Sequence, residues 1–123
     1  MLFRSLGLVG EPLLWRPAAV EGALAENLIP VVTPIAVGLN VNADEAAAAL
    51  AAGLAADRIV FVSDVPGVYL GGDVVKQIEI SQAEDLLDAG ALEGGIRPKV
   101  LAAVRAAKLG IRAEIGETAV VVA

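Results

Sequence analysis

The sequence predicts a single α/β domain with a mainly parallel sheet. Apolar runs of strand length alternate along the 123 residues with segments of helical character, and this alternation is typical of sheets whose strands are joined by helices. The residues are 57% hydrophobic and only 3% aromatic. Small side chains, chiefly alanine, must therefore fill a closely packed core, and so hydrophobic a chain is not disordered.

The first half of the chain predicts two strands and two helices. Residues 6–9 are a short strand candidate, and residues 17–27 predict a helix with a proline at an early position. The β-branched run at residues 29–35 predicts a strand that bends where its two prolines interrupt it. Residues 43–56 are mostly alanine and leucine and predict a helix, with Asn42 as its N-cap.

The middle of the chain predicts a buried strand followed by a hairpin. Residues 58–63 (RIVFVS) are the best candidate for a buried strand. The sequence DVPG at residues 64–67 then ends this strand in a turn. Residues 68–70 and 74–78 lie on either side of a Gly-Gly-Asp sequence, which predicts a β-hairpin.

The last third predicts two helices and two strands. Ser81 and Glu84 have the spacing of a capping box and predict a helix at residues 81–89. A final helix opens within the sequence GGIRPK and continues to Leu109. The two last strands are expected at residues 111–115 and 119–122.

Composition narrows the possible functions. Fifteen acidic residues against nine basic ones give a net charge of −6, which argues against nucleic acid or an anionic membrane as partner. The chain contains no histidine and no cysteine, which disfavours metal-dependent hydrolysis, Ser/His catalysis and disulfides. We predict no metal site held by protein side chains alone. The apolar stretches are too short or too interrupted for a signal peptide or a membrane span, so we expect a cytoplasmic protein.

Three polar residues alternate before the alanine-rich helix. Asn40, Asn42 and Asp44 are two residues apart, so in an extended segment they project to the same side, and the two amides could share a carboxylate or amide ligand. Asn42 is equally well explained as a helix cap, and Asp44 by its favourable position in the first helical turn. Asn40 has no such structural explanation.

The turn at residues 63–67 (SDVPG) is the second candidate site. In open α/β sheets, ligands bind in the crevice at the carboxyl ends of the strands, and this turn follows the best predicted strand. A strand that simply ends in a turn has the same sequence pattern, so both interpretations remain open.

The third candidate is the sequence GGIRPK at residues 94–99. It places Arg97 and Lys99 in a first helical turn, where the helix dipole disfavours cations by up to ~1 kcal/mol. The two glycines would allow backbone N–H groups to approach a phosphate, and Lys99 would supply a positive charge. The alternative is a solvated lysine on a helix that begins one or two residues later.

Five segments, in this order, resemble the amino-acid kinase family, and within it the acetylglutamate kinases. The resemblance covers the chain up to about Ile115 and implies a three-layer αβα architecture with a mainly parallel sheet. Residues 1–123 would form one domain with a carbamate kinase-like fold, similar to the ATP-binding half of an acetylglutamate kinase. The five segments are GLVGE (7–11), IPVVTPIA (29–36), NVNADEAAAALA (40–51), SDVPGVY (63–69) and GGIRPKV (94–100).

The resemblance also implies an activity and a set of site residues. Acetylglutamate kinases use ATP with Mg²⁺ to phosphorylate the γ-carboxylate of N-acetyl-L-glutamate, a step of arginine biosynthesis. By this resemblance Asn40 and Asn42 bind the acylated amino acid, Asp44 organises the catalytic lysines, and Lys99 stabilises the transferring phosphoryl group. The residues that would border the nucleotide are Ser63, Asp64, Gly67, Gly94, Gly95 and Ile96.

The chain departs from the family pattern at its amino-terminal side. The family's first lysine with its glycine pair, a second glycine-rich turn and a substrate-binding arginine have no counterpart here. We therefore expect a truncated protein with low or no activity alone, forming a homo-oligomer or pairing with a separate amino-terminal half. The alternatives are a non-catalytic remnant or partner module, and a related kinase for another carboxylate or phosphate acceptor.

Overall fold

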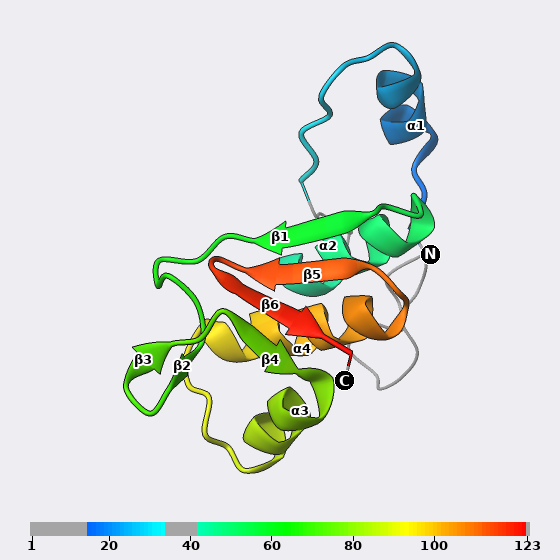
Figure 1. Ribbon diagram of the computed structural model, residues 1–123. Helices are drawn as coiled ribbons and strands as arrows, with labels where there is room; N and C mark the ends of the chain where they lie inside the picture. Colours follow the sequence, from blue (N-terminus) through cyan, green and yellow to red (C-terminus); the bar gives the residue numbers. More distant parts are fainter. Residues whose placement is uncertain (1–14, 34–41, 123) are drawn as a thin grey trace.

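The computed structural model describes residues 15–33 and 42–122 (Figure 1). Within these ranges the chain forms the helices and strands that the sequence predicts, except for the strand expected at residues 29–35. The helices are α1 (Ala18–Ala25), α2 (Ala43–Gly53), α3 (Ile80–Asp88) and α4 (Ile96–Lys108). The strands are β1 (Arg58–Phe61), β2 (Tyr69–Leu70), β3 (Asp73–Val74), β4 (Gln77–Glu79), β5 (Arg112–Ile115) and β6 (Thr118–Val121).

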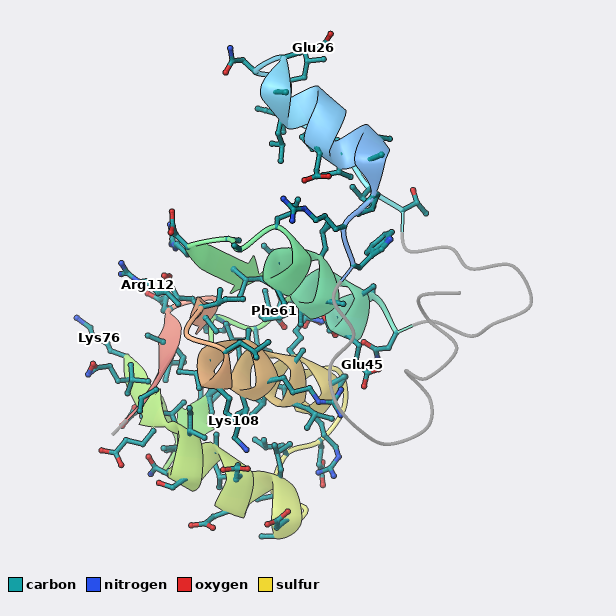
Figure 2. All side chains as sticks on the ribbon, turned by 90° about the vertical axis from the view of Figure 1, so that its right-hand side faces the viewer. Glu26, Glu45, Phe61, Lys76, Lys108 and Arg112 are labelled. Atoms are coloured by element: carbon teal, nitrogen blue, oxygen red, sulfur yellow. The ribbon has the colours of Figure 1, made fainter. Side chains whose placement is uncertain are left out.

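The main sheet has the order β1-β5-β6-β4. Strand β1 is parallel to β5 and β4 is parallel to β6, whereas β5 and β6 form an antiparallel hairpin in the middle. Most of the pairings are therefore parallel, and the predicted α/β fold is confirmed. Helices α2, α4 and α3 pack together on one face of this sheet, with α4 between the other two (Figures 1 and 2).

Small side chains form the core between the sheet and these helices. Helix α4 buries Ala102, Ala103 and Ala106 completely, which lets its backbone approach the sheet closely. Phe61 points from β1 into the space between the two layers (Figure 2) and is buried there. The alanine-rich core expected from the composition is thus present.

Helix α1 confirms the predicted helix at residues 17–27, and it lies apart from the sheet (Figure 1). The prediction of a strand at residues 29–35 is wrong for the described part, since residues 29–33 form no strand. Pro30 has no N–H to donate to a sheet, and Ile29 and Val31 are 91% and 95% exposed; none of the strands in the described ranges pairs with this segment. The predicted strand at residues 6–9 lies outside the described residues.

The N-termini of α2 and α3 test the two caps that the sequence predicts. Asn42 caps α2 as predicted. The capping box at Ser81 is wrong, because α3 already begins at Ile80 and its N-cap is Glu79, whose side chain makes no capping bond. Strand β4 ends at Glu79 and runs directly into the helix, so Ser81 lies inside the first turn.

The predicted hairpin is confirmed in part: β2 and β3 pair antiparallel, but the second strand ends at Val74 instead of continuing to residue 78. Gly71 and Gly72 have φ angles of +62° and +89°, the left-handed backbone that a tight two-residue hairpin turn requires. The chain then leaves the hairpin and joins the main sheet as β4. In the described part of the chain, no helix has the length and apolar character needed to cross a membrane.

Candidate functional site

The beginning of α4 has free backbone donors and positive charge. Gly95 is its N-cap and provides no side-chain acceptor, and the first turn contains no acidic residue. Arg97 turns away from this end, because its Nη1 donates to the Leu87 carbonyl oxygen at 2.9 Å, near the end of α3. The other cation of this turn, Lys99, points instead to the start of α2.

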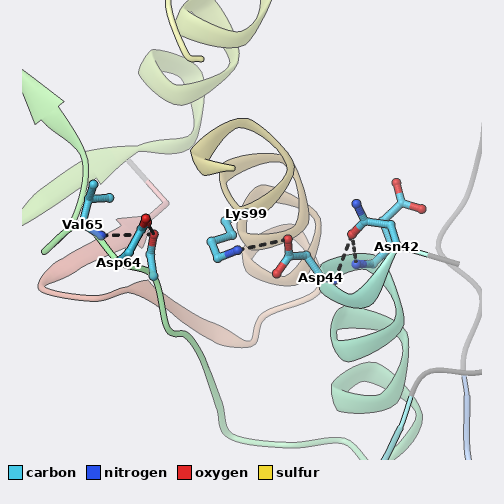
Figure 3. A network of polar contacts seen from close by, with 7 residues as sticks. Asn42, Asp44, Asp64, Val65 and Lys99 are labelled. Carbon is cyan, nitrogen blue, oxygen red and sulfur yellow. Dashed lines mark hydrogen bonds and ion pairs between the residues drawn. The ribbon is translucent and has the colours of Figure 1, made fainter. Parts of the chain in front are cut away.

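Lys99 lies against the beginning of α2. Its Nζ is 3.5 Å from Asp44 Oδ2, and the two side chains are only 20% and 18% exposed (Figure 3). The residues are 55 positions apart in sequence, and the packing of α2 on α4 brings them together. The contact is long for an ion pair, so the ammonium group keeps donor capacity for a further partner.

The start of α2 is held from two sides. Asn42 Oδ1 accepts hydrogen bonds from the backbone N–H groups of Asp44 and Glu45, at 2.8 and 3.1 Å. Glu45 Oε1 in turn pairs with Arg105 Nη1 of α4 at 3.1 Å, and both side chains are mostly buried. The cap and this second ion pair fix the turn that carries Asp44.

A pocket of about 250 Å³ lies between the turn after β1 and the segment before α4. The turn provides its polar groups from Ser63 and Asp64, and Tyr69 and Leu92 provide apolar surface. Five of the six residues that the resemblance assigns to the nucleotide line it, and Gly94 does not. The lining residues are Ser63, Asp64, Val65, Gly67, Tyr69, Ala91, Leu92, Glu93, Gly95 and Ile96.

The polar groups of the turn are held only weakly by the protein. Ser63 Oγ accepts from the Val65 N–H and donates to Asp64 Oδ1, both at 3.4 Å (Figure 3). These distances are at the long limit for a hydrogen bond. The hydroxyl and the carboxylate therefore remain able to bind a polar ligand.

Lys99 is next to this pocket along α4. Ile96 lines the pocket, and Lys99 lies three residues further on, so their side chains share one face of the helix about 5–6 Å apart at Cβ. In Figure 3 the Lys99 amine points to Asp44 and away from Asp64. The Lys99–Asp44 pair thus lies next to the helix N-terminus that borders the pocket, although neither residue lines the pocket itself.

Sequence reasoning missed part of this pocket and could not place one residue. The sequence could have indicated Tyr69 as a pocket residue, because it is the only tyrosine of the chain and ends the SDVPGVY segment. No sequence pattern indicated Leu92 or Glu93, because only the fold brings residues 91–93 beside the turn. Asn40 lies outside the described residues.

One charged cluster is separate from the site. Arg58 and Arg112 flank Glu114 on the face of the sheet opposite the helices, with Arg58 Nε 2.7 Å from Glu114 Oε1. The hydrogen bond from Arg58, helped by the charges of both arginines, holds the pKa of Glu114 below its ordinary value of 4.5 although partial burial opposes this. The same contact raises the pKa of Arg58.

No group of three or more acidic side chains that could hold a metal ion occurs in residues 15–33 and 42–122.

The fold and the site together define a class of protein. A mainly parallel sheet with a pocket at the carboxyl end of a strand, beside an uncapped helix N-terminus with a lysine, is an arrangement suited to phosphate-bearing ligands. Residues 2–117 match the model of the amino acid kinase family. The chain therefore belongs to the amino acid kinase family.

Relatives and solved structures agree with this assignment. The chain is 46% identical over 112 residues to an acetylglutamate kinase of Roseiflexus castenholzii, an alignment that covers 88% of this chain and 43% of the relative. It is 38% identical to an acetylglutamate kinase of Pseudothermotoga lettingae, covering 87% and 40%. The crystal structure of smu.665 from Streptococcus mutans superposes with a TM-score of 0.80 at 26% identity, covering 98% of this chain and 54% of that one. The chain thus spans about two fifths of the length of these curated relatives.

Proposed function

We propose that this chain is the nucleotide-binding part of an acetylglutamate kinase-like protein, which uses ATP to phosphorylate the γ-carboxylate of N-acetyl-L-glutamate in the cytoplasm. The observation that carries the proposal is that the SDVPG turn and residues 95–96, about thirty positions apart, line one pocket beside Lys99. The similarity to acetylglutamate kinases over most of the chain supports the choice of substrate.

The pocket suits the nucleoside part of the ligand. Its volume of about 250 Å³ is near the lower end of small-molecule sites, which run from roughly 300 to 1,000 Å³. The apolar surfaces of Tyr69 and Leu92 suit the faces of a base, and the polar groups of Ser63 and Asp64 suit a ribose or base edge. When bound, MgATP supplies the transferable phosphoryl group, and its metal neutralises part of the phosphate charge.

Lys99 and the first turn of α4 would hold the phosphates. The free N–H groups at this helix end favour anions, and the Lys99 ammonium has three donors, of which the long contact to Asp44 occupies one. Lys99 would neutralise charge on the phosphoryl group during transfer, and Asp44 would keep the ammonium directed into the site. Positioning and charge neutralisation of this kind are the main requirements of phosphoryl transfer, which needs no histidine.

Asn42 can serve both as a cap and as a substrate ligand. The cap uses its Oδ1 atom, so the Nδ2 group remains able to donate to a carbonyl or carboxylate of the acylated amino acid. Asn40 would be the second amide of this pair.

By itself the chain should turn over little, because the family's first lysine has no counterpart in it. The loss of one preorganised donor to the transition state commonly lowers the rate by ~10²- to 10³-fold.

Titration of ATP with excess MgCl₂ into the purified chain tests the proposal. We expect measurable heat and a rise in melting temperature at millimolar nucleotide. Lys99→Ala should weaken binding about tenfold or more, because charge-assisted contacts to phosphate are among the strongest hydrogen bonds. The matched control is Lys108→Ala, at the other end of α4, where the lysine pairs with Glu84 at 2.8 Å; its affinity should stay within twofold of wild type. No heat and no melting shift with the wild-type chain would refute nucleotide binding.

A non-catalytic partner module is the second candidate function. An apolar groove of about 360 Å³ lies between α1 and residues 30–33, lined by side chains such as Val20 and Val31, and Ile29 next to it is almost fully exposed. Apolar surface of this kind is typical of association sites. A dimer in sedimentation experiments, together with no response to MgATP, would favour this function over the kinase.

A further inference from the structure

Thr118 is buried beside the pocket but does not line it. It is the first residue of β6 and is 0% exposed, and among the residues that the structure describes it is the one buried polar side chain. Its hydroxyl donates to the Val75 carbonyl oxygen at 2.6 Å and accepts from the Val68 N–H at 2.9 Å. Both hydrogen-bonding functions of this group are therefore used within the protein.

These two bonds tie the pocket wall to the sheet. Val68 directly follows the SDVPG turn, and Val75 directly follows β3, so the hydroxyl connects the entry and the exit of the β2–β3 hairpin to β6. Val75 N–H also donates to the Val68 carbonyl oxygen at 3.0 Å, which closes the base of this hairpin. Five of the residues that line the pocket, from Ser63 to Tyr69, belong to the segment that is held in this way.

The contact between this segment and the β5–β6 turn leaves no free space. A methyl group on Gly67 would lie 2.5 Å from Thr118 Oγ1. On the other side, Gly116 has a φ of +54°, and a methyl group there would lie 2.3 Å from the Pro66 carbonyl oxygen. The Glu117 N–H also donates to the Pro66 carbonyl oxygen at 2.8 Å. The position of the turn is thus set by groups fifty residues away, with Thr118 at the centre.

We propose that Thr118 is a positioning residue of the nucleotide pocket, acting through its hydrogen bonds to Val68 and Val75. This inference rests on the proposed function for the identity of the ligand. Removing the hydroxyl leaves the buried Val68 N–H and the partly buried Val75 carbonyl without partners, and the wall that contains Gly67 and Tyr69 must shift to satisfy them. The affinity for nucleotide then falls although no atom of Thr118 touches the ligand.

Thr118→Val and Thr118→Ser test the inference, with MgATP as the probe. Valine has the shape of threonine without the hydroxyl, and we expect it to weaken ATP binding about tenfold. Serine keeps the hydroxyl and should stay within about twofold of wild type. The control is Ser81→Ala, which also removes a hydroxyl, because Ser81 is exposed on α3 and does not line the pocket; it should leave the affinity for ATP unchanged. Should the valine variant not fold, Thr118→Cys replaces it, since a thiol is a weak donor of similar size and should give an intermediate affinity.

The outcomes separate this inference from the proposed function. If the wild-type chain binds MgATP and folded Thr118→Val or Thr118→Cys binds it equally well, the positioning role is refuted and the proposed function stands. If the serine variant is as weak as the valine variant, the hydroxyl is not the cause and the inference is also refuted. If the wild-type chain itself does not bind MgATP, both proposals fall. Amide hydrogen exchange at Val68 gives an independent check, because faster exchange should accompany the weaker binding in the valine variant.

Discussion

Replacing Asp44 with asparagine removes the negative charge beside Lys99 and keeps the size of the side chain. Two stabilising effects are lost. The partly buried pair with Lys99, at 3.5 Å, contributes about 0.2–1 kcal/mol. A carboxylate in the first turn of α2 contributes about 0.3–1 kcal/mol through the helix dipole. The free energy of unfolding should therefore fall by about 1 kcal/mol, which lowers the melting temperature by roughly 3–6 °C in a domain of this size.

The affinity of the Asp44→Asn variant for nucleotide should rise although its stability falls. A phosphate bound on the far side of the Lys99 ammonium, which is 3.5 Å from Asp44, would lie about 7 Å from the carboxylate. The repulsion between two unit charges at that distance is about 0.6 kcal/mol in water. Because the asparagine Oδ1 can still accept a hydrogen bond from Lys99, the ammonium keeps its direction, and removing the repulsion should tighten ATP binding about threefold.

Thermal unfolding and calorimetric titration of the same Asp44→Asn sample measure both effects. Asp85→Asn is the matched control, because Asp85 is exposed on α3 and should change neither quantity by much. An Asp44→Asn protein with wild-type stability would show that the ion pair and the dipole contribute nothing. Weaker ATP binding in this variant would show that the phosphates do not lie next to Lys99, and would refute the proposed arrangement of the site.

Two further predictions concern the rest of the fold. Arg58 lowers the pKa of Glu114 in the folded protein. Glu114 therefore contributes stability that is present above about pH 4.5 and is lost as the pH falls through the lowered pKa. Glu114→Gln should destabilise the protein in urea unfolding at pH 7 and much less at pH 3; an equal effect at both pH values would contradict this origin. Gly116→Ala should lower the free energy of unfolding by about 1–3 kcal/mol or more, because its φ is +54° and the methyl group would meet the Pro66 carbonyl oxygen at 2.3 Å. The matched control is Gly22→Ala, where nothing lies within 4 Å and the helical backbone of α1 should make alanine stabilising by about 0.5–1 kcal/mol; urea unfolding of both variants measures the difference, and equal effects would contradict the steric argument.

Several elements could be predicted because their causes are local. The alanine-rich sequence forms α2 and Asn42 caps it, since both depend on neighbours within one turn. The Gly71-Gly72 pair forms the hairpin turn because glycine adopts positive φ without strain. The ordered motifs likewise predicted the family, which the match over residues 2–117 confirms.

Other predictions failed where a local signal met a tertiary constraint. Ser81 has the right spacing for a capping box, but β4 runs into α3 and starts the helix one residue earlier. The two cations at the start of α4 look equivalent in the sequence. The structure separates them, because the end of α3 offers Arg97 a carbonyl oxygen and α2 offers Lys99 a carboxylate.

The sequence by itself determined the helices, the hairpin, the alanine-rich core and the family, since these depend on residue types and short spacings. The family resemblance had grouped Lys99 with Asp44, and the SDVPG turn with residues 94–96, as site residues. Only the tertiary structure decided the contacts within these groups, the addition of residues 91–93 to the pocket, and the contact of Thr118 with the base of the hairpin. The physical reason is that these contacts join segments about thirty to fifty-five residues apart. Their geometry follows from the packing of α2 and α4 on the sheet, which no local pattern in the chain encodes.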